Sequence, residues 1–156
     1  PEMRQVLYRT AREAGASVHK GGTYLVIEGP ALSTRAESRL YRNWGADIIG
    51  MTTSPEAKLA REAEICYAAV AGITDYDCWQ NQGEPTPIDA IIETQKKNTK
   101  LIKETIRLSV HKTSRERRCN CGIAMKSAIV TDPASIPPEQ KERLKLLIGK
   151  YLSEEH

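Results

Sequence analysis

The stretch Cys66-Tyr-Ala-Ala-Val-Ala-Gly-Ile-Thr-Asp-Tyr-Asp-Cys-Trp79 decides the expected fold, because a short apolar run leads directly into a pair of acids. The apolar run over residues 68–73 is predicted to lie in a strand over 66–73 that is buried on both faces. Asp75 and Asp77 follow at its carboxyl end, which is where ligands bind in open α/β sheets. Buried carboxylates need partners, so the pair predicts a site. The alternative is that the two acids only begin a loop, as Asp often does.

The segments on either side of this stretch alternate between strand and helix patterns, which predicts an α/β protein. Upstream, strands are expected over residues 18–20, 23–28 and 46–51. Helices are expected over residues 1–14, 34–44 and 55–64, with Pro55 as the first residue of the third. Thr34 with Glu37 predicts a capping box at the second. Downstream, the patterns predict a loop over 79–87, a long amphipathic helix over 88–110 and a final helix over 138–152.

Composition describes an ordinary water-soluble chain of one domain. Its 156 residues are 40% hydrophobic and 28% charged, enough to build a core. The net charge of +3 is spread along the chain, so no nucleic-acid partner is expected. No apolar run approaches the ~20 residues that a membrane helix needs, so no membrane partner is expected either. We treat residues 1–110 as the core of this domain and residues 111–156 as a variable extension that carries the final helix.

Four cysteines raise the question of a metal or a disulfide. Cys66 opens the predicted strand and is expected to be a buried thiol, and Cys78 follows the acid pair. Cys119 and Cys121 are spaced more closely than a zinc CxxC half-site, and no second Cys or His pair completes one. No metal ligands are therefore predicted. Two free thiols and a local disulfide both remain open for the CxC pair.

Four short motifs occur in an order that is typical of one family. They are Glu28-Gly29-Pro30, Ser33-Thr-Arg-Ala-Glu-Ser38, Gly45-Ala-Asp47 with Gly50-Met-Thr-Thr-Ser-Pro-Glu56, and Thr74-Asp-Tyr-Asp-Cys-Trp79. Together they resemble the carboxyl-terminal half of the 5'-methylthioadenosine phosphorylases, in the trimeric branch of the purine nucleoside phosphorylase family. The resemblance covers roughly residues 1–110. It implies a mixed, twisted central sheet flanked by helices.

The resemblance also implies an activity. Such enzymes cleave 5'-methylthioadenosine with phosphate to adenine and 5-methylthioribose 1-phosphate, in the salvage of purines and methionine. Phosphate is the co-substrate, and no metal or organic cofactor is used. The expected setting is a cytoplasmic homotrimer, or a higher assembly, with active sites near the subunit interfaces.

Site residues follow from matching positions in the motifs. Thr52 and Ser33 match phosphate-binding positions, and Ser33 and Ile88 match positions tied to substrate choice. Asp75 matches the acid at purine N7, and Asp77 a second acid at the amino edge of the base. The complete substrate-binding set implied by the resemblance is Leu32, Met51, Asp75, Tyr76, Asp77, Ile88, Ile91 and Ile92. Within it, Met51 lies against the ribose, while Ile91 and Ile92 line the methylthio pocket or belong to the helix core.

The chemistry explains why an acid is needed at residue 75. Glycosidic cleavage leaves negative charge on the departing base, and a proton donated to N7 stabilises it. Burial and the nearby carboxylate of Asp77 both favour the protonated form of such an acid. A protonated Asp pairs with N7 and with the 6-amino group of adenine, whereas a 6-oxopurine suits Asn better. Asp75 therefore predicts an aminopurine substrate.

Two departures from the family pattern lead to further expectations. Ala31-Leu32 stands where the family usually has Arg-Phe, so Leu32 covers the base without aromatic stacking, typically ~0.5–1.5 kcal/mol. The Gly-rich phosphate loop and the Arg-His pair of the family's amino-terminal half have no counterpart here. The chain is therefore expected to be a carboxyl-terminal fragment that is completed by an amino-terminal half, either as a second chain or as a lost segment.

Three further readings of these motifs remain open. A nucleosidase would use water, although Thr52 suits phosphate better than the Glu of nucleosidase relatives. A phosphorylase of other specificity, or a non-catalytic subunit that binds purine or supports assembly, would fit the change to Leu32.

The CxC pair also resembles one that forms a disulfide in some heat-stable relatives.

Overall fold

The computed structural model describes residues 2–80 and 86–152, and it divides the chain into two compact units. The first unit contains residues 1–54 and 68–115, and the second contains residues 55–67 and 116–156. The stretch 66–79 therefore crosses from one unit to the other. The expectation of one domain whose core ends near residue 110 stays a prediction.

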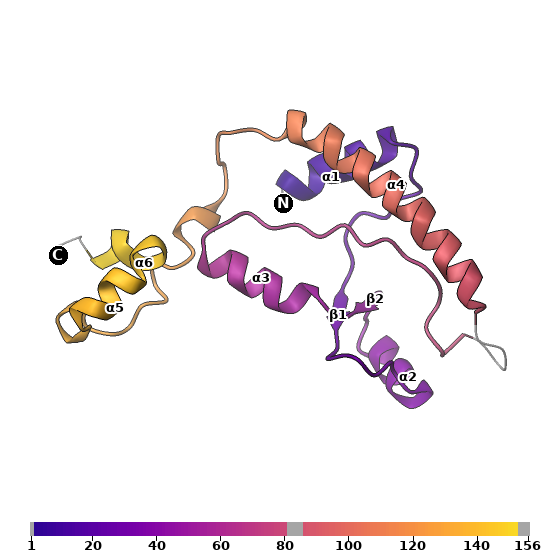
Figure 1. Cartoon of the computed structure of the whole chain (residues 1–156), viewed down its shortest axis with the longest axis horizontal. Helices are drawn as coiled ribbons and strands as arrows, with labels where there is room; N and C mark the ends of the chain where they lie inside the picture. Colours follow the sequence, from indigo (N-terminus) through magenta and orange to yellow (C-terminus); the bar gives the residue numbers. More distant parts are fainter. Residues whose placement is uncertain (1, 81–85, 153–156) are drawn as a thin grey trace. The chain divides into compact units, whose positions relative to one another are not determined.

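The first unit contains a parallel pair of strands joined by a helix. β1 (Tyr24–Val26) pairs with β2 (Ile48–Gly50), with Tyr24 opposite Ile48, and α2 (Arg35–Asn43) forms the crossover (Figure 1). Parallel strands need such a crossover, because a hairpin turn cannot return the chain to the same end. The strands predicted over 23–28 and 46–51 are confirmed, although each is shorter than expected.

The ends of α2 are set by local sequence. The Thr34 hydroxyl accepts the backbone N–H of Glu37 at 3.3 Å, while the Glu37 carboxylate accepts the backbone N–H of Thr34 at 2.8 Å. This is the predicted capping box. At the other end Gly45 has a φ of +81°, which glycine adopts without strain. The helix therefore starts and stops where the sequence predicts.

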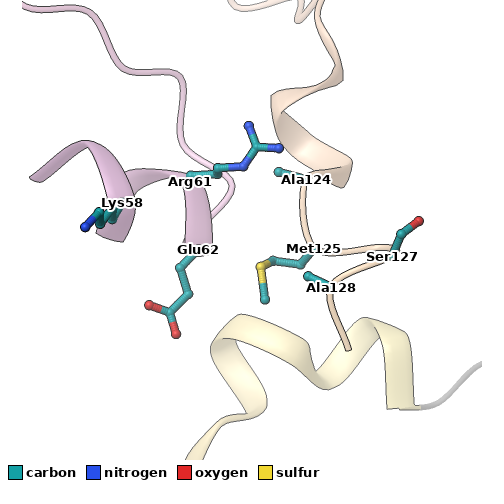
Figure 2. A pocket seen from close by; sticks show the side chains of 7 residues that line it. All are labelled: Lys58, Arg61, Glu62, Ala124, Met125, Ser127 and Ala128. Carbon is teal, nitrogen blue, oxygen red and sulfur yellow. The ribbon is translucent and has the colours of Figure 1, made fainter. Parts of the chain in front are cut away.

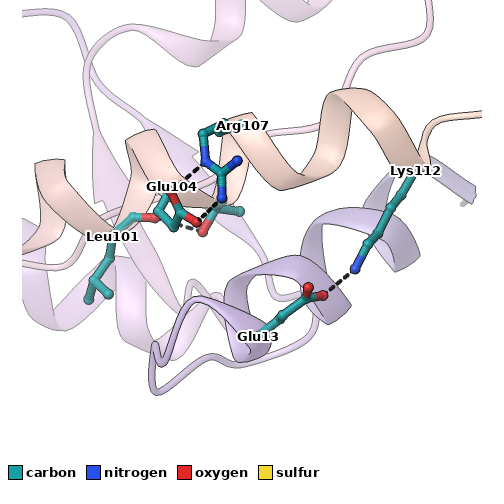
Figure 3. A network of polar contacts seen from close by, with 6 residues as sticks. Glu13, Leu101, Glu104, Arg107 and Lys112 are labelled. Atoms are coloured by element: carbon teal, nitrogen blue, oxygen red, sulfur yellow. Dashed lines mark hydrogen bonds and ion pairs between the residues drawn. The ribbon is translucent and has the colours of Figure 1, made fainter.

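Two further helices of the first unit pack against each other. α1 (Glu2–Glu13) packs against α4 (Ile88–Lys112), and an ion pair between Glu13 and Lys112 joins them (Figure 3). Thr10 and Thr105 are the most buried side chains of these helices. Each hydroxyl donates to a backbone carbonyl of its own helix, so its burial leaves no hydroxyl unpaired. The predicted apolar face of the long helix is covered only in part, since Ile106 and Val110 are exposed.

The strand predicted over residues 66–73 is wrong. The segment carries no strand, and it is not buried on both faces, since Val70 is 39% and Ile73 is 55% exposed. A strand needs a hydrogen-bonding neighbour, and within the described residues β1 and β2 pair only with each other. One side-chain bond holds the end of the segment, from the Asn98 amide to the Ile73 carbonyl at 2.8 Å. The strand predicted over 18–20 is wrong for the same reason.

The second unit is helical. It contains most of α3 (Thr53–Glu62), the short 3₁₀ turns η1 (Asn120–Ile123) and η2 (Pro133–Ser135), and the helices α5 (Pro138–Arg143) and α6 (Lys145–Leu152). The predicted final helix is thus divided in two at Leu144, whose φ of −99° and ψ of 7° leave the helical region. Pro55 is the third residue of α3 rather than its first, so that helix begins two residues earlier than predicted.

Glu64 organises the second unit. Its φ of +55° closes the end of α3, a position that usually needs glycine. The buried carboxylate accepts hydrogen bonds from Lys150, Tyr151 and the backbone N–H of Met125. Burial opposes its charge most strongly, but these bonds together outweigh it and lower the pKa of Glu64 to about 2. The residue therefore ties α3 to α6 and to the segment after η1.

This pKa predicts a pH dependence of folding stability. Because the pKa of Glu64 is lower in the folded chain than the value of 4.5 in the unfolded chain, its ionised carboxylate stabilises the fold at pH values above 4.5. This contribution is lost as the pH falls towards about 2. Unfolding between pH 4.5 and pH 2 should therefore take up about one proton at Glu64. We expect Glu64→Gln to lower stability at pH 7 and to remove this proton uptake, as measured by urea unfolding across the pH range. Glu62→Gln, on the exposed last turn of α3, is the matched control, and an equal effect there would contradict the assignment.

Hydrophobic burial is sparse in the described chain. Ala11, 5% exposed, is the one fully buried hydrophobic side chain among residues 2–80 and 86–152. The expected core is thus largely absent from this chain by itself, and many large apolar side chains face outward. Within the same residues, no helix combines the length and the apolar character that a membrane span requires.

Candidate active site

Two contacts in the first unit join the four sequence motifs in pairs. The Cys78 thiol donates to the carbonyl of Ser33 at 3.4 Å, which joins the second motif to the fourth. The Arg42 guanidinium lies 3.5 Å above the ring of Trp79 and reinforces the same junction. Met51 packs so tightly on Gly29 that a Cβ there would lie 2.7 Å from the sulfur. This last contact joins the first motif to the third.

The fourth motif borders an open hollow of about 380 Å³. The residues that line it are Ile73, Thr74, Asp75, Tyr76, Gln80 and Thr86. Asp75 is exposed, and one of its oxygens accepts the hydroxyl of Thr74 at 2.6 Å. Tyr76 meets Trp79 edge to face at 6.0 Å between ring centroids. The hollow therefore presents one oriented carboxylate beside apolar and aromatic surface, an arrangement suited to a planar base.

The two acids differ in their surroundings. Asp77 is half-buried and accepts the backbone N–H of Cys78 at 2.9 Å, so a local turn orients it. Asp77 does not line the hollow, whereas Asp75 does. The prediction that both acids are buried is wrong for this chain, because the segment that carries them is extended and uncovered.

The predicted phosphate residues lie just beyond the strands. Thr52 is exposed and follows β2 by two residues, immediately before α3. The first backbone N–H groups of a helix have no partners within that helix. Thr52 directly precedes these groups of α3. Ser33 is half-buried and precedes the cap of α2, with its carbonyl held by Cys78. Each residue thus lies in, or next to, one of the motif contacts described above.

The predicted apolar residues of the site do not line the hollow in this chain. Leu32 is 82% exposed and Ile88 is 74% exposed, the latter at the start of α4. Ile92 is also exposed, while Ile91 is half-buried. No described part of the chain covers these exposed side chains. A closed apolar pocket around them would therefore need atoms beyond the described residues.

A second, larger hollow of about 540 Å³ lies in the second unit. Figure 2 shows it between the end of α3 and the segment after η1, where Arg61 and Glu62 lie opposite Ala124 and Met125. Lys58, Ser127 and Ala128 complete its lining. None of the predicted substrate-binding residues borders it, so the Asp75 hollow remains the candidate active site.

The structure also forms a cysteine cluster that sequence reasoning missed. The sulfurs of Cys66, Cys119 and Cys121 all lie within 4.8 Å of one another, and Cys66 contacts Cys119 at 3.4 Å. All three are half-buried free thiols. The bond to Cys119 raises the pKa of Cys66 to about 11, while the backbone N–H of Cys121 lowers the pKa of Cys119. The only sequence signal was the CxC pair, because Cys66 lies 53 residues from Cys119.

These features define an α/β protein with a parallel pair of strands and a candidate site at the Asp75 hollow, the class that includes the nucleoside phosphorylases. The sequence model of the Phosphorylase superfamily matches residues 1–109. The chain belongs to this superfamily.

Individual relatives share most of this chain. An S-methyl-5'-thioadenosine phosphorylase of Geobacter sulfurreducens is 57% identical over 146 residues, which are 94% of this chain and 51% of the relative. A protein of the same name from Koribacter versatilis is 46% identical over 99% of this chain and 53% of its own length. The chain thus spans about half the length of the curated relatives that it matches.

Solved structures agree with the sequence comparisons. A methylthioadenosine phosphorylase from an antarctic soil metagenomic library superposes with a TM-score of 0.85 at 40% identity, over 94% of this chain and 53% of that one. An adenosine/methylthioadenosine phosphorylase variant of Schistosoma mansoni, in complex with adenine, has a TM-score of 0.69 at 31% identity, over 81% and 50%. The predicted nucleoside phosphorylase-like fold is therefore confirmed.

Proposed function

We propose that this chain supplies the purine-binding part of an enzyme that cleaves 5'-methylthioadenosine with phosphate, giving adenine and 5-methylthioribose 1-phosphate. The observation that carries the proposal is the junction of the Asp75 motif with the Ser33 motif through the bond between Cys78 and the Ser33 carbonyl. The names of the relatives in both comparisons support the substrate. The proposal extends to a role in purine and methionine salvage.

Asp75 is the proposed general acid. Its carboxylate faces the open hollow, with one oxygen held by Thr74 and the other available to a base. A bound purine and the remainder of the enzyme would cover this exposed group, and desolvation favours the protonated acid that N7 requires. Protonation of N7 as the glycosidic bond breaks leaves neutral adenine as the leaving group.

The other site residues take the remaining parts of the substrate. Thr52 and Ser33 are proposed to bind phosphate, with Thr52 beside the unpaired N–H groups at the start of α3. Met51, already packed on Gly29, would lie against the sugar. Tyr76 is positioned at the hollow to contact the base.

The site is proposed to be composite. The chain spans about half of its relatives, and Leu32, Ile88, Ile91 and Ile92 surround no closed pocket in the described residues. We infer that an amino-terminal half, in the same or another chain, supplies the rest of the phosphate site and covers these residues. The remaining parts of the proposal are a cytoplasmic homotrimer or higher assembly and a reaction that uses phosphate as co-substrate without a cofactor.

The proposal is tested by assaying the assembled enzyme that contains this chain on 5'-methylthioadenosine. We expect adenine release that depends on phosphate and is matched one for one by 5-methylthioribose 1-phosphate. Equal release in phosphate-free buffer would identify a nucleosidase instead. Binding of adenine without any release would identify a non-catalytic purine-binding subunit, and either result would overturn the proposal.

A further inference from the structure

The three-cysteine cluster of the second unit, made of Cys66, Cys119 and Cys121, has the geometry of a metal site. Thiolates around a zinc ion lie ~2.3 Å from it, which places sulfurs about 3.8–4.0 Å apart. The closest pair here is 3.4 Å apart, and all three sulfurs lie within 4.8 Å. Changes of no more than about 1 Å in these separations would therefore bring all three sulfurs to one ion.

The backbone around the cluster already holds the ligands in place. Cys119 caps η1 in an extended conformation, and Cys121 lies inside that turn, so both sulfurs come from one short segment. Cys66 follows directly after the closed end of α3, whose turn at Glu64 is anchored by three hydrogen bonds. Preformed ligand positions of this kind reduce the ordering cost of binding an ion.

The charges around the cluster also suit a cation bound by thiolates. Three thiolates and one divalent ion carry a net charge of −1, and the guanidinium of Arg117 acts on Cys119 from nearby. Arg117 is itself held by the carbonyl of Glu64 at 3.0 Å.

We propose that Cys66, Cys119 and Cys121 bind one thiophilic divalent ion of the Zn²⁺ class, with the fourth position open to water. Soft thiolate ligands select zinc over magnesium or calcium. Binding releases the thiol protons to solvent and cross-links the end of α3 to η1, 53 residues away in sequence. The role of the ion is structural, because none of these residues borders the Asp75 hollow.

The test uses the full protein, reduced under anaerobic conditions and stripped of metal with a chelator. Titration with Cd²⁺ should produce the ultraviolet charge-transfer absorption of cadmium thiolate and reach one ion per chain, and Zn²⁺ should displace it. Cys66→Ser and Cys119→Ser should each weaken binding at least ~10-fold, the loss seen even for groups that only support a ligand. Cys78→Ser is the matched control, because its thiol bonds Ser33 in the first unit.

Alkylation of thiols gives a second measurement that does not depend on the variants folding. With Zn²⁺ bound, only Cys78 should react with iodoacetamide, whereas the stripped protein should label at all four cysteines. The proposal is overturned if the wild-type protein takes up no Cd²⁺, if Cys66→Ser binds as tightly as wild type, or if Zn²⁺ protects none of the three thiols. A Cys66–Cys119 disulfide in protein purified without oxygen would also overturn it, since the bond consumes two ligands.

Discussion

Asp75→Asn should reduce the rate of 5'-methylthioadenosine phosphorolysis by about 10²–10⁴-fold in the assembled enzyme, the usual cost of losing a positioned general acid. The amide keeps the shape of the side chain and its bond to Thr74, but it has no proton to transfer to N7. Its N–H can instead donate to a 6-oxo group. The ratio of kcat/KM for methylthioinosine over methylthioadenosine should therefore rise while the methylthioadenosine rate falls.

Asp132→Asn is the control for this experiment. Asp132 caps the η2 turn, where its carboxylate accepts the N–H of Ala134 at 2.9 Å, and Asn caps almost as well as Asp. Kinetics should be unchanged in this variant. Asp77→Asn should have a smaller effect than Asp75→Asn, because Asp77 bonds its own turn and lies outside the hollow. If Asp75→Asn behaved like the control on both substrates, Asp75 would be a turn residue and not the acid.

The 156-residue chain expressed by itself should release no adenine above background and should self-associate. Among residues 2–80 and 86–152 the sheet has two strands, so the outer edges of β1 and β2 are unpaired there, and such edges pair with other chains. Large apolar side chains, including Leu32, Ile88 and Val110, are exposed and drive association. Light scattering after size-exclusion chromatography should give a mass well above the 17.4 kDa of one chain.

The relative from Geobacter sulfurreducens provides the matched comparison for this experiment. Its intact form serves as the positive control for the assay, and the half that aligns with this chain should behave as this chain does. Addition of the complementary half should restore phosphate-dependent adenine release. A soluble monomer of this chain that turns over 5'-methylthioadenosine unaided would contradict the composite site.

Local features of the fold were predictable because their hydrogen bonds join residues that are near one another in sequence. The capping box of Thr34 and Glu37 and the glycine that ends α2 depend on side chains within a few residues of the helix ends. The long helix over residues 88–110 followed in the same way from its periodicity. The strand over 66–73 did not, because apolar composition alone cannot supply the neighbouring strand that would pair with it.

The sequence by itself determined the family, the order of the four motifs and the identity of the candidate site residues, since these are properties of residue type and spacing. Only the tertiary structure decided which residues meet. It placed Cys78 on the carbonyl of Ser33, left Asp75 open to a hollow, and brought Cys66 to the CxC pair across 53 residues. Contacts of this kind depend on how the whole chain packs, and no local pattern of residues encodes them.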